Sequence, residues 1–474
     1  MPTASRRRST RSDSEIVSPS DTGIREGSLQ APSRHPLDWR KPEFVDEAAL
    51  EKELERVFDI CHGCRRCFSL CNSFPTLFDA IDASETLELD GVDKKVYWDV
   101  VDHCYLCDMC FMTKCPYVPP HPWNIDFPHL MLRAKHVQHR KGEHSFRDRL
   151  LSNTRGLGSI AGIPVVAEIV NAVNNTSAGR KLLEKTLGVA PDAPIPKFHS
   201  KTGSKRARAL AGAPAEIRPT EETRGRVALF VTCYGDRNEP HLPEDLAVVF
   251  RHNGIEVRVV GKEKCCGMPK LELGDLDTVE KYKNFNIPQL RQLVDEGYDI
   301  VAPIPSCVLM FKQELPLMFP EDADVQLVKQ HIFDPFEYLM LRHKAGLLRT
   351  DFQQQLGKIS YHVPCHLRVQ NMGLKTRDVL RLVPGTTVEV IERCSGHNGT
   401  YAVKKEFRAA SVKIGAPVVR RVQQSGSDHY SSDCPMAGHQ IESGLSPPDG
   451  ATDGAAQSRA PEHPMSLVRK AYGI

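Results

Sequence analysis

Two cysteine blocks decide how this chain folds: CHGCRRCFSLC at residues 61–71 and CYLCDMCFMTKC at residues 104–115. Each block spaces three cysteines by two residues, so one tight loop can wrap three corners of a [4Fe–4S] cluster. The fourth iron needs a thiolate from elsewhere, and in two-cluster ferredoxins the other block supplies it. The spacing therefore predicts two [4Fe–4S] clusters with crossed ligands. One set is Cys61, Cys64, Cys67 and Cys115, and the other is Cys104, Cys107, Cys110 and Cys71.

Structural zinc is the alternative for these blocks. A tetrahedral zinc ion takes four ligands, usually from two CxxC pairs. Three cysteines within each tight loop exceed that need, so clusters are the favoured prediction. Arg65, Arg66 and Lys114 stand between the cysteines. They are either solvated surface charges or groups that offset cluster charge and dock an acidic electron donor.

The composition is typical of a soluble globular protein, and 474 residues suggest roughly three domains. The net charge of +2 gives no case for a nucleic-acid partner. Fifteen cysteines, mostly in CxxC or CC arrangements, favour metal binding in a reducing compartment, so we expect a cytoplasmic protein. No apolar run reaches the length of about 18 residues that a membrane-spanning helix needs. The apolar patch near Ile160 is expected to pack as a linker helix; the alternative is peripheral contact with the inner face of the cytoplasmic membrane.

The C-terminal half alternates strands and helices, and does so twice. Apolar, β-branched runs at residues 227–232, 255–260 and 299–304 predict buried strands, and a cysteine follows each one. Runs at residues 358–363, 387–391 and 429–432 repeat the same order, which indicates a duplicated module. Open α/β sheets bind ligands at the carboxyl ends of their strands. Each module should therefore gather its cysteines at one edge.

The sequence around these cysteines resembles the cysteine-rich CCG domain. The first module carries Cys265-Cys266-Gly267, and the second carries HVPCH at residues 362–366 and ERCSGHNGT at residues 392–400. The whole chain resembles CCG-domain iron–sulfur oxidoreductases, such as the C subunit of anaerobic glycerol-3-phosphate dehydrogenase and proteins like the B subunit of heterodisulfide reductase. The resemblance implies a further metal centre at the CCG cysteines, either a non-cubane [4Fe–4S] cluster or zinc.

The family motif has five cysteines per module, and this chain departs from it. Carried over, the motif places the catalytic metal centre of the first module at Cys233, Cys265, Cys266 and Cys307, with Met310 in the fifth position. The second module keeps Cys365, Cys394 and Cys434, with Ser395 and Ala437 in the other positions. A nearby histidine (His366, His397 or His439) completes this second site, or the site stays open, or its thiols are only structural. A redox disulfide between Cys265 and Cys266 is a further alternative.

We therefore expect a multidomain fold of mixed α+β and α/β class. It consists of a helical two-[4Fe–4S] ferredoxin-like domain followed by two duplicated βα CCG modules. The expected divisions are a disordered tail (1–44), the ferredoxin-type domain (45–140), a helical linker (141–224), the first module (225–345), the second module (346–443) and a flexible C-terminal tail (444–474).

The expected function is that of an iron–sulfur oxidoreductase subunit. Electrons would pass from a partner, expected to be a flavoprotein dehydrogenase, through two [4Fe–4S] clusters to the CCG centre and on to a quinone or a disulfide-type acceptor. The alternative is a non-catalytic electron carrier or membrane-anchoring subunit, for example one that serves a rubrerythrin-like peroxidase. The sequence carries no GxGxxG or P-loop motif, so we expect no dinucleotide or ATP site.

Overall fold

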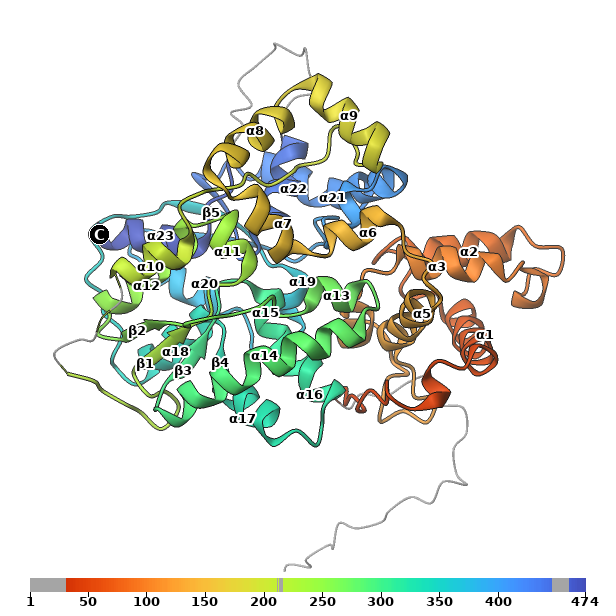
Figure 1. The fold of residues 1–474 in the computed structure, drawn as a ribbon, viewed down its shortest axis with the longest axis horizontal. Helices are drawn as coiled ribbons and strands as arrows, with labels where there is room; N and C mark the ends of the chain where they lie inside the picture. The colour runs from red at the N-terminus through yellow and green to blue at the C-terminus, as the bar shows by residue number, and fades with distance from the viewer. Residues whose placement is uncertain (1–30, 211, 213–215, 446–459) are drawn as a thin grey trace, which may run out of the picture.

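The molecule combines a helical N-terminal domain with two parallel β-sheets. A computed structural model describes residues 31–210, 212, 216–445 and 460–474. In Figure 1 the helices of the N-terminal domain lie to the right of the two sheets, and linker helices form the upper edge of the molecule. The parallel sheets and two βα modules agree with the expected mixed class.

The N-terminal domain is built on α1 (Glu47–Cys64), which carries the chain into the first cysteine block. Asp46 caps this helix by accepting a hydrogen bond from the backbone N–H of Ala49. The predicted apolar face, including Leu50 and Phe58, is buried. The helix ends at Arg65, which adopts the left-handed conformation. The other elements of this domain are η2 (Pro42–Phe44), α2 (Ser73–Asp82), η3 (Leu89–Gly91), α3 (Lys95–His103), α4 (Met109–Thr113) and α5 (Phe127–Lys141).

The first module has a four-stranded parallel sheet with the order β2-β1-β3-β4. Its strands are β1 (Arg226–Leu229), β2 (Glu256–Val259), β3 (Asp299–Val301) and β4 (Ile332–Phe333). The first three were predicted, whereas the two-residue β4 is too short to give a strand pattern. Its helical elements are α11 (Cys233–Arg237), α12 (His241–His252), α13 (Met268–Glu272), α14 (Leu276–Asp295), α15 (Pro305–Leu309), η4 (Met310–Glu314), α16 (Leu315–Met318), α17 (Ala323–His331) and α18 (Pro335–Lys344).

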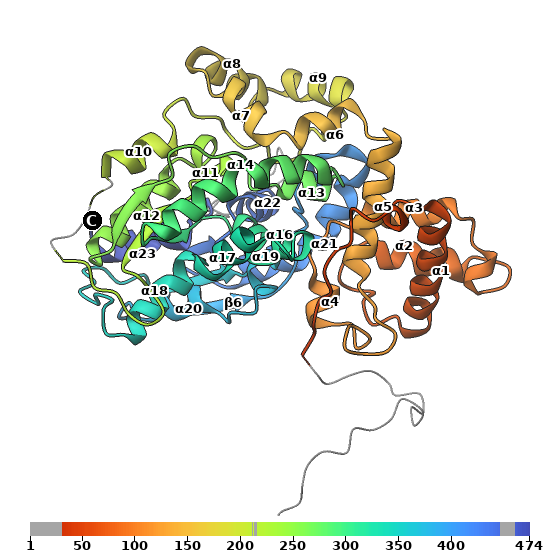
Figure 2. The same cartoon turned by 60° about the horizontal axis from the view of Figure 1, so that its bottom comes forward.

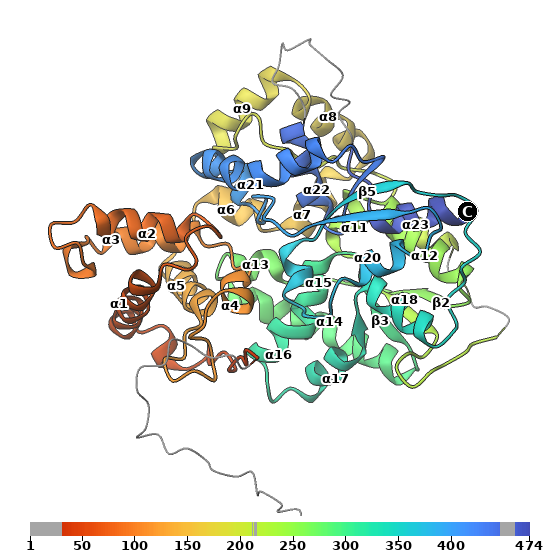
Figure 3. The same ribbon diagram turned by 180° about the vertical axis from the view of Figure 1, so that it is seen from behind.

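The second module repeats the central part of this sheet, as predicted. Its strands β5 (Lys358–His362), β6 (Thr387–Ile391) and β7 (His429–Ser432) pair in parallel with the order β6-β5-β7. Its helical elements are α19 (Cys365–Arg368), α20 (Lys375–Leu380), η5 (Tyr401–Val403), α21 (Lys405–Gln424) and α22 (Pro435–Leu445). The view from behind in Figure 3 shows α21 and α22 running beside the linker helices.

The linker between domain and modules is helical, as expected, but one face of it is not packed. Its helices are α6 (Phe146–Leu151), α7 (Thr154–Ala161), α8 (Pro164–Asn174), α9 (Ser177–Leu187) and α10 (Gly203–Leu210). Ile160 and Val165 are each 66% exposed, so the expectation of a packed helix near Ile160 is wrong. Among the described residues no single helix is long and apolar enough to cross a membrane. Helices α7 and α8 together reach the required length and apolar composition, but the chain bends by 105° between them.

The prediction of a disordered tail to residue 44 is wrong for residues 31–44. Leu37, Trp39 and Phe44 are buried, and the backbone N–H of Leu37 donates to the carbonyl of Leu317. A few apolar side chains in a Pro- and Arg-rich context give no periodic signal, because they fill grooves made by other elements. The rest of the predicted tail, residues 1–30, lies outside the described residues.

The predicted flexible C-terminal tail is also partly wrong. Residues 464–472 form α23 (Pro464–Tyr472), which packs on α12 of the first module. Leu467 and Tyr472 are buried in the core that the two modules share. The apolar residues near the chain end were the signal for this docking. Residues 446–459 of the predicted tail lie outside the described residues.

Candidate functional site

The thiols of the first cysteine block gather at the C-terminal end of α1. Cys61 and Cys64 lie on its last turn, and the left-handed Arg65 turns the chain so that Cys67 can follow in the loop. Burial raises the pKa of the Cys61 thiol, and the neighbouring thiols Cys67, Cys115 and Cys64 raise it further. The structure thus brings together the four thiols predicted for the first cluster. All four are only half-buried.

The second block is more enclosed. Cys104 caps α3, and Leu106 and Asp108 take left-handed conformations that fold the loop tightly before α4. Cys104 and Cys110 are buried. Burial raises the pKa of Cys110, and so do Cys67, Cys107, Cys104 and Cys71. Cys71 of the first block therefore lies among the thiols of the second, the arrangement that crossed ligation needs.

The donor sets suit clusters in their chemistry, since each offers four thiols and thiolates are the ligands of [4Fe–4S] clusters. Burial, and then the neighbouring thiols, raise the pKa of Cys67 to about 12, so this thiol is protonated in the bare protein. Binding of a cluster would therefore release protons. Within the described ranges no three His, Cys, Asp or Glu side chains are arranged to hold a single metal ion.

The four cysteines of the first module lie together at the carboxyl edge of its sheet, as predicted. Cys233 begins α11 after β1, Cys265 and Cys266 follow β2, and Cys307 lies in α15 after β3. The Sγ atoms of Cys233 and Cys265 are 4.0 Å apart. Cys266 also lies close enough to Cys265 and to Cys307 for these thiols to shift its pKa. Cys265 and Cys266 are free thiols, so the structure does not contain the alternative disulfide.

Met310, in the fifth motif position, is a core residue here. Its side chain is fully buried, and its Cε would lie 3.2 Å from a Cβ added to Gly267. Gly267 has φ of +110°, a conformation that favours glycine. Met310 therefore supports the Cys265-Cys266-Gly267 turn from the core.

Two groups beside the first module's thiols were not predicted. The Thr154 hydroxyl, at the start of α7, lies 3.2 Å from Cys233 Sγ and 3.7 Å from Cys265 Sγ. Glu263 is buried and accepts a hydrogen bond from the N–H of Val231. Burial raises the pKa of Glu263 to about 8, so the carboxyl group is largely protonated near neutral pH. Thr154 sits in the linker, where no motif marks it.

The three cysteines of the second module also lie together. Cys365 begins α19 after β5, Cys394 follows β6 and Cys434 follows β7. Burial raises the pKa of Cys365, followed by the effects of Cys394 and Cys434. The N–H of Gly396 donates to Cys394 Sγ over 3.3 Å. Ser395 and Ala437, which replace motif cysteines, are buried.

The second module adjoins the second cysteine block. Burial raises the pKa of Cys107, and the next largest effects come from Cys365 and Cys394. The Tyr105 hydroxyl, between Cys104 and Cys107 in sequence, lies 3.6 Å from Cys394 Sγ. The predicted cluster ligands and the second module's thiols thus face one another.

The three histidines near the second module differ in what they can do. His366 uses both ring nitrogens, with Ser306 Oγ at 2.7 Å and the Leu106 carbonyl at 3.4 Å. His439 lies between Glu239 at 2.8 Å and Glu442 at 2.9 Å, and these carboxylates outweigh burial and raise its pKa to about 9. His397 Nε2 is buried and has no hydrogen-bond partner among the described residues. Burial lowers the pKa of His397 to about 4, so its ring is neutral.

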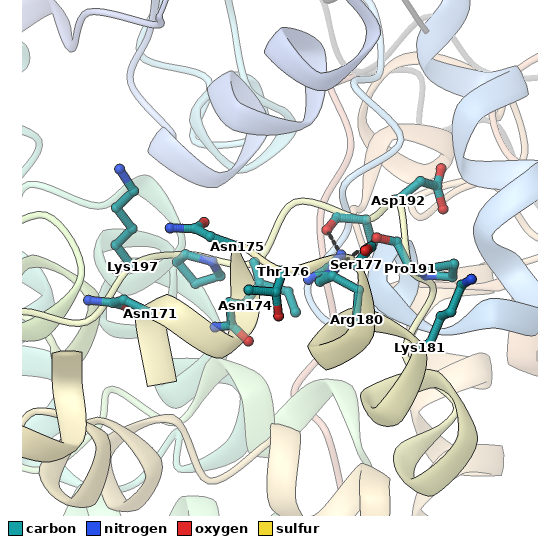
Figure 4. Close-up of a pocket in the computed structure, with 13 residues that line it drawn as sticks. Asn171, Asn174, Asn175, Thr176, Ser177, Arg180, Lys181, Pro191, Asp192 and Lys197 are labelled. Carbon is teal, nitrogen blue, oxygen red and sulfur yellow. Dashed lines mark hydrogen bonds between the residues drawn. The ribbon is translucent and has the colours of Figure 1, made fainter. Parts of the chain in front are cut away.

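A cavity of about 640 Å³ lies elsewhere, between α8, α9 and residues 191–197. Figure 4 shows its lining, in which Arg180 donates to backbone carbonyls of the adjoining loop. None of the residues that line it is a cysteine. The cavity is therefore separate from the thiol centres.

Comparisons with known proteins agree with this geometry. The family model of the cysteine-rich CCG domain matches residues 227–312 and 359–442, which contain the seven cysteines of the modules and the strands of both sheets apart from β4. The C subunit of anaerobic glycerol-3-phosphate dehydrogenase from Escherichia coli (strain K12) is 29% identical over 352 residues, which cover 74% of this chain and 83% of that protein.

Two further relatives match a smaller part of the chain. The B subunit of fumarate reductase (CoM/CoB) from Methanothermobacter marburgensis is 26% identical over 46% of this chain and 42% of its own length. Lactate utilization protein A of an Exiguobacterium strain is 29% identical over 43% of this chain and 82% of its own length. The chain therefore carries two CCG cysteine-rich domains and is related to subunits of oxidoreductases.

Proposed function

We propose that this chain relays electrons from a partner protein, through two [4Fe–4S] clusters, to the CCG modules and on to a quinone or a disulfide-type acceptor. Such clusters take up and release single electrons. The observation that carries the proposal is the contact of Tyr105, which stands between Cys104 and Cys107, with the second module: its hydroxyl lies 3.6 Å from Cys394 Sγ. A cluster held by Cys107 would lie directly beside the second module.

The exposure of the two blocks supports a direction for this relay. The thiols of the first block are half-exposed, whereas in the second block Cys104 and Cys110 are buried and Cys107 and Cys115 are half-exposed. Phe68 is 56% exposed in the loop between Cys67 and Cys71. A partner would therefore dock at the first block, and electrons would leave from the second. A flavoprotein dehydrogenase fits this role, and a rubrerythrin-like protein is the alternative partner.

The two modules contact each other close to their thiols. Ser306, next to Cys307 of the first module, shares a hydrogen bond of 2.7 Å with His366, next to Cys365 of the second. Helices α15 and α19 pack together at this point. Electrons that reach the second module would pass here to the four-thiol centre of the first, which we propose to be the catalytic one.

Metal analysis of anaerobically purified full-length protein tests this proposal. We expect about eight irons with matching acid-labile sulfide for two cubane clusters, and more if a CCG cluster is present. EPR of the reduced protein should then show interacting [4Fe–4S] signals. Zinc without iron or sulfide would refute the cluster proposal, whichever partner is used.

We further propose that the protein works at the inner face of the cytoplasmic membrane. The observation in favour is the unpacked apolar face of α7 and α8, where Ile160, Ile163, Val165 and Ile169 are each more than half exposed. Figure 1 places α8 at the upper edge of the molecule, with α7 beneath it. An amphipathic face of this kind binds the interfacial region of a bilayer.

Co-sedimentation with vesicles tests the membrane contact. Wild-type protein should sediment with vesicles of mixed neutral and anionic lipid, and the triple variant I160S/V165S/I169S should stay in the supernatant. Val412→Ser is the matched control, since Val412 is 47% exposed on α21 and should not alter binding. Equal sedimentation of the triple variant and wild type would rule out this face as the contact.

A further inference from the structure

Residues 31–45 form a strap across the boundary between the N-terminal domain and the first module. Figure 2 shows this segment, in dark red, running beside α4. Leu37 binds the backbone of Leu317, and Trp39 Nε1 donates to the carbonyl of Met318. The strap thus contacts α16 of the first module.

Arg34 is the charged centre of this strap, and its side chain is only 8% exposed. It donates to both carboxylate oxygens of Asp108, at 2.6 and 3.0 Å, and to both of Asp126, at 2.8 and 3.0 Å. Glu314 lies 3.7 Å away, and the guanidinium covers the ring of Phe111 at 4.6 Å. An arginine that binds a carboxylate through two parallel hydrogen bonds fixes the orientation of that carboxylate in addition to neutralising its charge.

Two of the carboxylates around Arg34, those of Asp126 and Glu314, have lowered pKa values. Burial opposes ionisation of Asp126, but His129 and Arg34 outweigh it and lower its pKa to about 2. Burial also opposes ionisation of Glu314, and His129 and Arg34 again lower its pKa. Three carboxylates thus face one guanidinium and His129, which lies 3.3 Å from Asp126 and 3.5 Å from Glu314. Removing the positive charge of Arg34 would leave a strongly negative cluster of side chains.

Asp108 connects this charged group to the second cysteine block. It lies between Cys107 and Cys110, has φ of +59°, and begins the turn that leads into α4. It also accepts a hydrogen bond of 3.1 Å from Gln313 of the first module. Phe111, beneath the guanidinium, directly follows Cys110 in sequence. Arg34 therefore holds the loop whose thiols are predicted to bind the second cluster.

We propose that Arg34 is a positioning residue that fixes the Cys107–Cys110 loop and raises the reduction potential of the cluster bound there. This inference rests on the proposed presence of the two clusters. Reduction adds one electron, hence one negative charge, to the cluster and changes no bond at Arg34. A positive charge nearby stabilises the reduced form, and cluster potentials respond to local charge.

Redox titration of the full-length, cluster-loaded protein, followed by EPR, tests the proposal with variants of opposite sign. Arg34→Gln should shift the midpoint potential of one cluster to more negative values. Asp108→Asn should shift the same midpoint to more positive values, because it removes a negative charge, and asparagine tolerates the left-handed conformation of this position. Arg34→Lys, which keeps the positive charge, should have a midpoint potential near that of the wild type.

Lys114→Gln is the matched control, because Lys114 lies near Cys67 and lowers the pKa of that thiol of the first set. Lys114→Gln should shift the midpoint potential of the cluster bound by the first set of thiols. It should leave unchanged the midpoint potential of the cluster that Arg34 and Asp108 affect. If Arg34→Gln does not take up clusters, Asp108→Asn still decides the question. Unchanged midpoints, or shifts of the same sign in Arg34→Gln and Asp108→Asn, would overturn the proposal. Protein without iron and sulfide would instead refute the proposed function itself.

Discussion

The two CCG modules share one sheet design but differ in what surrounds their thiols. In the first module the four thiols contact one another in succession, and the Thr154 hydroxyl adjoins them. In the second module two of the three thiols, Cys365 and Cys394, lie near Cys107 or Tyr105 of the second cysteine block. The module with fewer thiols is therefore the one whose thiols adjoin the second cysteine block. In this molecule the larger set of thiols and the position beside the predicted electron source thus belong to different modules.

The largest expected effect comes from making the first module like the second. Cys266→Ser would turn Cys265-Cys266-Gly267 into the Cys-Ser-Gly form found at residues 394–396. We expect turnover with the physiological partner to fall at least 100-fold, because a thiolate is lost from the proposed catalytic centre, while the EPR signals of the cubane clusters remain.

Steady-state assays and EPR on the same preparation measure both quantities. Ser395→Cys, the reverse exchange in the second module, is the control and should retain turnover. Full activity of Cys266→Ser would mean that the first module is not catalytic.

The glycines of the two motifs should differ in their tolerance to alanine. A Cβ at Gly396 would lie 2.1 Å from the backbone oxygen of Ser411 on α21, whereas one at Gly267 would meet the flexible end of Met310. Both have positive φ. We expect Gly396→Ala to destabilise the fold by about 3 kcal/mol or more, and Gly267→Ala by about 1–2 kcal/mol.

Anaerobic denaturant unfolding compares these two variants with Gly254→Ala. Gly254 has φ of +70° and open space around it, so this control isolates the backbone cost, about 1 kcal/mol. Equal destabilisation by Gly396→Ala and Gly267→Ala would contradict the tighter packing around Gly396.

His397→Ala tests whether the second module binds metal through a non-cysteine ligand. His397 is the one candidate of the three whose Nε2 has no partner among the described residues. A neutral imidazole is a good metal ligand. We expect lower iron content and acceptor reduction slowed several-fold, with cubane signals intact.

His366→Gln serves as the control, because both nitrogens of that ring are already hydrogen-bonded within the protein. It should keep the iron content of wild type. If His397→Ala also keeps its iron and its acceptor kinetics, the second module has either three ligands or no metal.

The smallest expected effect is a pH dependence at the contact between the modules. His439 bridges Glu239 of the first module and Glu442 of the second, and its pKa is raised to about 9 from an ordinary value near 6.5. A raised pKa means that the protonated bridge stabilises the folded state fully below about pH 6.5. This stability is lost as the pH rises through about 9.

Thermal unfolding of metal-free protein between pH 6 and 10 measures this loss. Because His439 is about one-third exposed, solvent screening limits the expected change to roughly 1 kcal/mol. His439→Gln should flatten the profile over this range. An unchanged slope in that variant would assign the pH dependence to other groups.

Much of this arrangement could be predicted from sequence, because its signals are local. Strand runs ending at cysteines predicted both sheets, and cysteine spacing predicted that Cys71 lies among the thiols of the second block. The roles of Arg34 and Thr154 could not be predicted. Both act across long sequence separations from segments without periodicity, and their partners are fixed only by the packing of domains.

The histidines illustrate the same limit within one motif. Sequence placed His366, His397 and His439 near cysteines and could not rank them. Their hydrogen bonds show which ring is available as a metal ligand. His366 is bonded to Ser306 and His439 to Glu239, and both partners come from the first module, which the local sequence does not show. The sequence predicted that the apolar face near Ile160 is packed, whereas it is exposed. Apolar composition alone does not tell whether another element of the protein covers such a face.

The docking of α23 has a consequence for how the two modules hold together. The helix packs on α12 and ties Arg469 to Asp245 of the first module. Its buried side chains Leu467 and Tyr472 belong to a core that contains residues of both modules and none of the cysteines. Removal of Pro464–Tyr472 should therefore weaken the association of the modules without deleting a thiol.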